Sequence, residues 1–115
     1  LTIFDNMSRL DQLFDLLKKQ PNEPFLLFAI AKEYEKAKDL DKALEYYVEL
    51  YDTSPEYVGT YYHLGKLYEK LKNPDKALHT YKQGMAIARM QGETHAHSEL
   101  AGAAMNIAED GDEDF

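Results

Sequence analysis

Apolar side chains recur every three or four residues along this chain, which is the spacing of the buried face of an amphipathic helix. The first apolar stripe runs from Ile3 to Leu17 and stops before Pro21. It predicts an opening helix over residues 3–20, because a proline usually ends a helix at the preceding residue. Similar stripes follow, and short segments that contain Asp, Asn or Pro separate them. The pattern predicts an all-α fold.

The middle of the chain repeats itself with a period of 34 residues. After this shift, ten positions of a sixteen-residue window are identical. The identical pairs are Lys32/Lys66, Tyr34/Tyr68, Glu35/Glu69, Lys36/Lys70, Lys38/Lys72, Asp41/Asp75, Lys42/Lys76, Ala43/Ala77, Leu44/Leu78 and Tyr47/Tyr81. A fixed period of this length predicts a helical array in which each unit buries its apolar face against the next.

The repeated residues resemble the consensus of the tetratricopeptide repeat. The two copies read Tyr61-x-x-Leu64-Gly65-x-x-Tyr68 with Ala77-x-x-x-Tyr81, and Leu27-x-x-Ile30-Ala31-x-x-Tyr34 with Ala43-x-x-x-Tyr47. Pro55 stands where the family ends its second helix with a proline. The chain departs from the pattern at Leu27, where an aromatic is common, and at Arg89, where the second copy should have its proline. The last helix of the second copy is therefore expected to run on.

The resemblance implies a TPR-like array of helical hairpins that winds as a short right-handed superhelix. The 34-residue shift also places Leu13 and Pro21 on Tyr47 and Pro55, so the opening helix is interpreted as the second half of an earlier repeat. After Gly92 the consensus fails, but an amphipathic stripe continues and predicts a capping helix. The predicted bounds are a single domain over 1–108, repeat one over 24–57, repeat two over 58–91, the capping helix over 93–108 and an acidic tail over 109–115.

Each repeat is expected to contain a helix A and a helix B joined by a short turn. Asn73 is predicted to cap helix B of repeat two, with Pro74 in the first helical position, and Asp39 is predicted to cap the equivalent helix of repeat one. Small residues are expected where the paired helices approach most closely, and tyrosines around them. These positions are Ala31, Gly65, Ala43 and Ala77, with Tyr34, Tyr68, Tyr47 and Tyr81.

Composition and charge exclude several classes of function. The net charge is −8, which argues against a nucleic-acid binder because phosphate contacts require clustered Lys and Arg. The absence of cysteine excludes disulfides and thiolate zinc sites. No stretch approaches the roughly 20 apolar residues of a membrane helix. A first segment without the features of a secretory signal makes the cytoplasm the expected location.

The sequence contains no recognisable catalytic set, so an enzyme is not expected. Phosphate-binding loops, nucleophile elbows and zinc-protease motifs are missing. His95 and His97 point in different directions on a helix, and His95 with Glu99 offers only two exposed ligands, so neither a metal nor any other cofactor is expected. His79 is expected on the surface, whereas His63 lies on a face that the resemblance marks as functional.

In the family that the chain resembles, the inner faces of successive A helices line a concave groove that binds peptide segments of partner proteins. In this chain the stripe is distinct from the packing stripe, and it combines aromatic with charged residues. Its candidate binding residues are Phe28, Lys32, Lys36, Tyr62, His63, Lys66, Glu69 and Lys70.

This mixture suits an extended peptide with an apolar anchor and an acidic group or a C-terminal carboxylate. A clamp for chaperone tails is not expected, because the asparagines of that branch of the family are missing. The competing interpretation is structural: the opening helix covers Phe25 and Phe28, and the Lys and Glu residues are ordinary solvated surface.

The leading hypothesis is therefore a non-enzymatic protein-interaction module, or scaffold, that binds a partner peptide in the A-helix groove. The alternative is a structural unit, either a spacer or a self-assembling homodimer, that packs through its terminal helices. Apolar residues at both ends motivate this alternative: Ile3, Phe4 and Met7 at the start, and the surface around Ala101, Gly102 and Met105.

Overall fold

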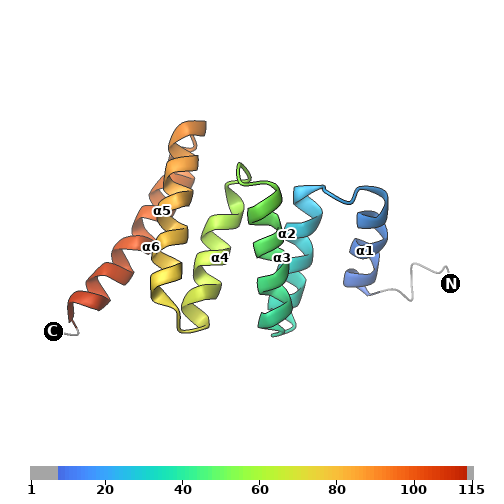
Figure 1. The fold of residues 1–115 in the computed structure, drawn as a ribbon, viewed down its shortest axis with the longest axis horizontal. Helices are drawn as coiled ribbons and strands as arrows, with labels where there is room; N and C mark the ends of the chain where they lie inside the picture. The colour runs from blue at the N-terminus through green and yellow to red at the C-terminus, as the bar shows by residue number, and fades with distance from the viewer. Residues whose placement is uncertain (1–7, 114–115) are drawn as a thin grey trace. The chain divides into compact units, whose positions relative to one another are not determined.

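The computed structural model describes residues 8–113 as a chain of six helices, without strands in that range (Figure 1). The helices group into two compact units, residues 1–55 and residues 56–115. The first unit contains α1 to α3 and the second contains α4 to α6. The all-α prediction is therefore confirmed.

The first unit consists of α1 (Arg9–Lys19), α2 (Pro24–Lys36) and α3 (Leu40–Thr53). Its α1–α2 core is made of Leu13, Leu26 and Ile30, each at most 6% exposed. Further aromatic contacts surround this core: Tyr34 stacks on Tyr46 with ring centroids 5.7 Å apart, and Phe14 packs against both rings. The opening helix is thus held by apolar contacts to repeat one, as expected for half of a preceding repeat.

The second unit consists of α4 (Gly59–Lys70), α5 (Pro74–Gln91) and α6 (Thr94–Glu113). Two glycines bring these helices close together. A methyl group at Gly65 on α4 would overlap the buried ring of Tyr81 on α5. A methyl group at Gly84 on α5 would overlap Tyr61 of α4 and press on Leu100 of α6. Both glycines therefore permit backbone approaches that any larger residue would prevent.

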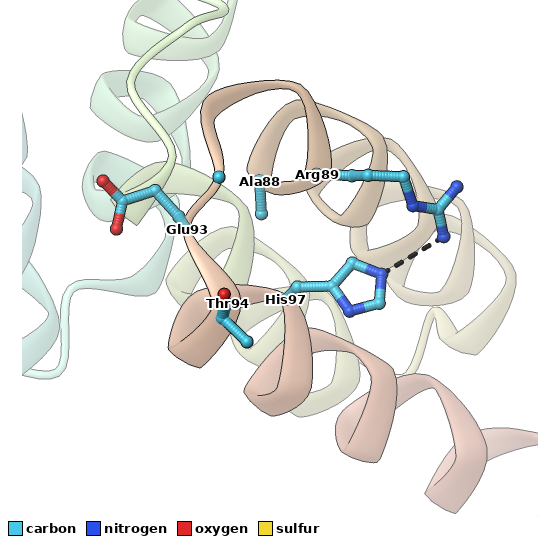
Figure 2. Close-up of a pocket in the computed structure, with 6 residues that line it drawn as sticks. Ala88, Arg89, Glu93, Thr94 and His97 are labelled. Carbon is cyan, nitrogen blue, oxygen red and sulfur yellow. Dashed lines mark hydrogen bonds between the residues drawn. The ribbon is translucent and has the colours of Figure 1, made fainter.

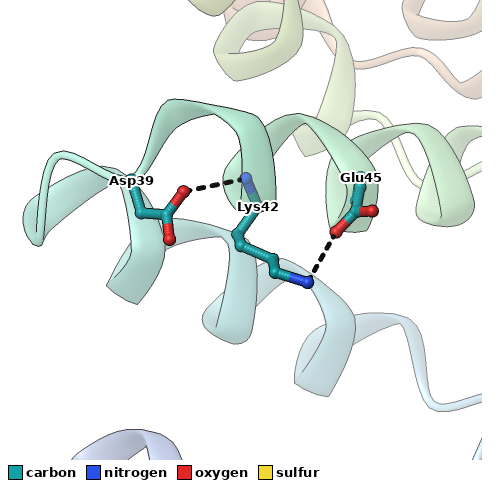
Figure 3. Close-up of polar contacts among 3 residues, drawn as sticks. All are labelled: Asp39, Lys42 and Glu45. Carbon is teal, nitrogen blue, oxygen red and sulfur yellow. Dashed lines mark hydrogen bonds and ion pairs between the residues drawn. The ribbon is translucent and has the colours of Figure 1, made fainter.

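The predicted caps of the two B helices are confirmed. The Asp39 side chain accepts a hydrogen bond from the Lys42 amide at 3.2 Å (Figure 3), and the Asn73 side chain accepts one from the Lys76 amide at 3.3 Å. Pro74 follows its cap at the first helical position. Each cap satisfies a backbone donor that has no partner inside the helix.

The A helices end in a conformation that the sequence pattern does not reveal. Lys38 and Lys72 both adopt left-handed backbone geometry, with φ of 65° and 63°. In α4 the Lys72 amide donates to the Glu69 carbonyl and the Asn73 amide to the Tyr68 carbonyl, and α2 has the equivalent pair of bonds. These paired bonds define a Schellman ending, in which glycine is the usual residue.

Helices α2 and α3 lie within residues 24–57, and α4 and α5 lie within residues 58–91, the ranges predicted for the two repeats. Helix α1 begins at Arg9, because Ser8 is extended and caps the helix by accepting a hydrogen bond from the Asp11 amide at 3.0 Å. Residues 1–7, and with them the apolar start at Ile3, Phe4 and Met7, lie outside the described residues. At the other end α6 continues past residue 108 to Glu113, so the predicted tail is helical that far.

Candidate peptide-binding faces

Helix α4 groups four of the eight candidate residues on one face. The rings of Tyr62 and His63 meet edge to face with centroids 5.7 Å apart. The Lys66 ammonium lies 5.5 Å from the centre of the Tyr62 ring and 3.7 Å from a carboxylate oxygen of Glu69. Lys66 follows Tyr62 by four residues and His63 by three, and Glu69 follows Lys66 by three, so the helix places Lys66 beside the other three side chains, as the sequence pattern predicts.

A cleft of about 240 Å³ opens beside this face, between α4 and α6 in the second unit. Leu100 forms a buried part of its wall, and Tyr62 and His63 contribute the aromatic side. Glu99 supplies a carboxylate, which lies 3.5 Å from the imidazole of His95. The residues that line the cleft are Val58, Gly59, Tyr62, His63, Ala96, Glu99 and Leu100. The contribution of α6 was not part of the sequence prediction, because the third copy of the consensus fails there.

Glu69 has a structural role that the sequence interpretation missed. The hydroxyl of the buried Tyr81 donates a hydrogen bond to its carboxylate. The Tyr47 hydroxyl donates to Glu35 in the first unit in the same way, at 2.6 Å. Burial raises the pKa of both tyrosines, and the hydrogen bonds to the glutamates raise it further. The signal was present in the sequence, since both pairs have a separation of 12 residues and recur with the 34-residue period.

The first unit presents the equivalent face on α2. Phe28 is half-buried and meets the Tyr47 ring edge-on, with centroids 6.2 Å apart. Lys32 and Lys36 are exposed. Phe25 is 56% exposed, so the opening helix does not cover it as the structural interpretation had expected. The face therefore carries one anchored aromatic ring and two basic residues that solvent reaches.

The remaining candidate, Lys70, is exposed in the last turn of α4 and does not line the cleft. In the part of the chain that is described, no group of three or more His, Asp or Glu side chains is placed to hold a metal ion. None of the described helices combines the length and the hydropathy that crossing a bilayer requires.

Comparison with known proteins gives the family. Residues 34–101 match the tetratricopeptide repeat family, and the chain belongs to that family. Domains of this family generally serve as protein–protein interaction modules and are generally non-catalytic. No curated protein matches the chain.

Solved structures support the same assignment. One similar crystal structure is that of a tetratricopeptide repeat domain protein from Salinibacter ruber, which is 45% identical in sequence to this chain. The TM-score is 0.72, and the match covers 75% of this chain and 97% of that chain. A solution structure of such a domain from the same organism is 46% identical, with a TM-score of 0.73 over 76% and 88% of the two chains. A protein from Bordetella parapertussis, 22% identical, shares the fold with a TM-score of 0.77 over 90% of each chain.

Proposed function

We propose that this chain is a non-enzymatic interaction module that binds an extended peptide segment of a partner protein through its A-helix faces. The observation that carries the proposal is the cleft between α4 and α6, which has the aromatic side chains of Tyr62 and His63 in its wall and Lys66 in contact with Tyr62. A concave, mainly apolar site with a few polar groups is the usual form of a ligand site.

The chemistry of the cleft favours a peptide with one apolar anchor residue. Leu100 and Ala96 give it apolar walls on α6, and the Tyr62 ring offers a large flat surface on α4. Aromatic side chains in such positions contribute most of the binding energy in many interfaces. The anchor side chain of the peptide would therefore fill the cleft and exclude water from these surfaces.

The neighbouring lysine favours an acidic group beside that anchor. The Lys66 and Glu69 side chains are 39% and 35% exposed, and ion pairs at this exposure contribute little to stability. Because Tyr81 already donates a hydrogen bond to Glu69, the Lys66 ammonium can turn to a ligand carboxylate while Glu69 keeps a partner. Lys70 would add to the attraction, since charge steers the approach of an acidic segment.

The α2 face offers the same combination on the first unit. Phe28 provides a partly exposed aromatic ring, and Lys32 and Lys36 supply basic groups. We propose that this face takes the same class of ligand, an acidic segment with apolar residues.

A peptide-display selection tests the proposal. Random peptides are selected on the wild-type chain, and the affinities of the selected peptides are measured by fluorescence anisotropy. We expect acidic sequences with one recurrent apolar position, and Tyr62→Ala and Lys66→Glu should each weaken binding about tenfold or more, equivalent to about 1.4 kcal/mol.

Matched controls are available on α5, in the same unit. Met90→Ala removes a side chain that is 83% exposed, and Lys82→Glu reverses an exposed charge on a B helix. Neither change should alter peptide affinity, and circular dichroism should show that all four variants are folded. Equal binding by the Tyr62, Lys66 and control variants would refute the proposed site.

Self-assembly through the terminal helices is the second candidate. Leu16 on α1 is 46% exposed and Met105 on α6 is 60% exposed, so both end helices present a large apolar side chain to solvent. Association through them would give a homodimer or a longer head-to-tail assembly. Light scattering over a range of concentrations tests this candidate, and a constant monomer mass would eliminate it.

A further inference from the structure

A second concave site lies where α5 turns into α6, and the peptide-binding proposal does not use it. It is an open depression of about 230 Å³, lined by Ala88, Arg89, Gly92, Glu93, Thr94 and His97 (Figure 2). Arg89 projects from α5 and His97 from α6, and their Nη2 and Nε2 atoms are 3.3 Å apart. Two basic side chains from different helices thus converge at one pocket.

Helix α5 departs from the family pattern at this pocket. Position 89 is one period after Pro55, and α3 ends at Thr53, before that proline. With Arg89 in place of a proline, α5 continues to Gln91, and Gly92 then turns the chain with φ of 70°. A proline at this position would lack both the guanidinium and the backbone donor. The presence of arginine where the family has proline therefore allows the helix to continue, and it places the guanidinium charge at the pocket.

The donors around the pocket are suited to a tetrahedral anion. The guanidinium of arginine presents a planar fork of N–H groups that matches phosphate oxygens. Thr94 also lines the pocket, at the first turn of α6, where the helix dipole favours negative charge, and its amide donates a hydrogen bond to the Gly92 carbonyl at 3.1 Å. Glu93 is the one acidic residue of the lining, and its carboxylate points away from the Arg89–His97 pair in Figure 2.

We propose that this pocket binds a phosphate monoester dianion or free phosphate, with its oxygens accepting hydrogen bonds from Arg89 and His97. In the structure the imidazole Nε2 of His97 accepts a hydrogen bond from the Arg89 guanidinium. When the anion is bound, the ring carries its proton on Nε2 and becomes a donor, so the two side chains separate to hold the ligand between them. Ala88, which also lines the pocket, is fully buried.

An NMR titration tests this proposal. Inorganic phosphate, a phosphoserine peptide and the same unphosphorylated peptide are added separately at constant ionic strength, while the Arg89 side-chain, His97 ring and Thr94 amide signals are followed. We expect saturable shifts with both phosphate probes and none with the unphosphorylated peptide. Tighter binding of the peptide would indicate a phosphorylated partner, whereas tighter binding of inorganic phosphate would indicate a free anion.

Variants at the surface of the pocket make the test specific. Arg89→Gln and His97→Gln should weaken phosphate binding at least about tenfold, since each removes a charge-assisted hydrogen bond. Arg89→Lys should weaken phosphate binding less, because lysine keeps the positive charge and loses only the planar pair of N–H donors. Lys82→Gln, which removes an exposed charge elsewhere on α5, should have no effect. Linear shifts without saturation, or shifts unchanged in Arg89→Gln, would mean an adventitious ion only and would overturn the proposal.

Discussion

The two repeats share their local structure and differ in how closely their helices pack. Both have a side-chain cap on helix B, a left-handed lysine after helix A and a buried tyrosine bonded to a glutamate. At the position of closest approach, however, repeat one has Ala31 and repeat two has Gly65. A second pair of equivalent positions also differs: repeat one has the buried Leu50, and repeat two has Gly84, which is 34 residues later.

The difference shows that one consensus allows two ways of filling the same space. In repeat two the rings of Tyr81 and Tyr61 occupy the volume above the two glycines, and Leu100 of α6 reaches Gly84. In repeat one the Ala31 methyl group and the Leu50 side chain are themselves fully buried. Both arrangements fill the interior at the density typical of proteins. In repeat two, however, the tyrosine rings already occupy the space, so a methyl group added at either glycine would overpack it.

The largest effect is expected from adding that methyl group. Gly65→Ala would force the Tyr81 ring, which is fully buried, out of its place. We expect a loss of about 2–3 kcal/mol in the free energy of unfolding, measured by urea denaturation, despite the better helix propensity of alanine. Ala31→Gly in repeat one should cost only about 1 kcal/mol. Equal costs at the two sites would show that the packing of the repeats does not differ.

Removing the tyrosine hydroxyl that donates to a glutamate should lower the stability of both repeats by similar amounts. Tyr47→Phe and Tyr81→Phe each delete a hydrogen bond to a carboxylate. Such bonds to charged groups contribute about 1.5–3 kcal/mol, and we expect losses near the lower end because the glutamates are only partly buried. Thermal melts of the single and double variants measure the effect, and an unchanged melting temperature would contradict it.

The same tyrosines predict a loss of stability at alkaline pH. Their pKa in the folded chain is raised by burial and by the hydrogen bonds to Glu35 and Glu69. The stabilisation is therefore complete below the ordinary tyrosine pKa of about 10, and it falls as pH rises further, because the unfolded chain releases these protons first. The decline is at most about 1.4 kcal/mol per pH unit for each tyrosine. Urea denaturation between pH 8 and pH 11.5 should show a shallower decline for the double phenylalanine variant than for wild type.

Removing the B-helix caps should cost about 1 kcal/mol in each repeat. Asp39→Ala should cost a few tenths more than Asn73→Ala, because the aspartate also places a negative charge at the positive end of the helix dipole. Chemical denaturation of both variants at low salt measures the difference. At high salt the charge contribution is screened, so the two costs should converge.

The smallest effect should be a gain in stability. Lys72→Gly relieves the left-handed conformation of an L-residue, which costs roughly 1–2 kcal/mol, but it also increases the entropy of the unfolded chain. We expect a net gain of about 0.5–1 kcal/mol, and a similar gain for Lys38→Gly. Lys82→Gly, within α5, is the matched control and should destabilise the protein by about 1 kcal/mol.

Much of the fold could be predicted from the 34-residue period. The repeat boundaries, the caps at Asp39 and Asn73 and the small residues between paired helices all follow from short-range patterns that recur in the sequence. The start of α1 at Arg9 was missed because the apolar stripe continues back to Ile3, and stripe periodicity does not reveal where a cap interrupts a helix. The Schellman endings were missed because lysine, unlike glycine, does not indicate a left-handed residue.

The candidate peptide-binding residues were predicted in part. Helical spacing alone brings Tyr62, His63 and Lys66 onto one face, and the structure keeps them there. The hydrogen bond from Tyr81 to Glu69 was missed, because the recurring 12-residue separation marks the pair without showing that the two side chains meet, which depends on the face of α5 that packs on α4. The walls that α6 contributes to the cleft were also missed, since no consensus marks that helix.

Sequence by itself determined the family and the helical repeats, because the 34-residue period repeats the same residue types at the same positions. It also determined the caps of the B helices, because a cap depends on residues within one helical turn. Only the tertiary structure decided which side chains from different helices meet. The Tyr81–Glu69 bond, the cleft beside Tyr62 and the Arg89–His97 pair all join residues on separate helices. Their positions depend on the distance and rotation between helices, which packing around Gly65 and Gly84 sets and periodicity does not encode.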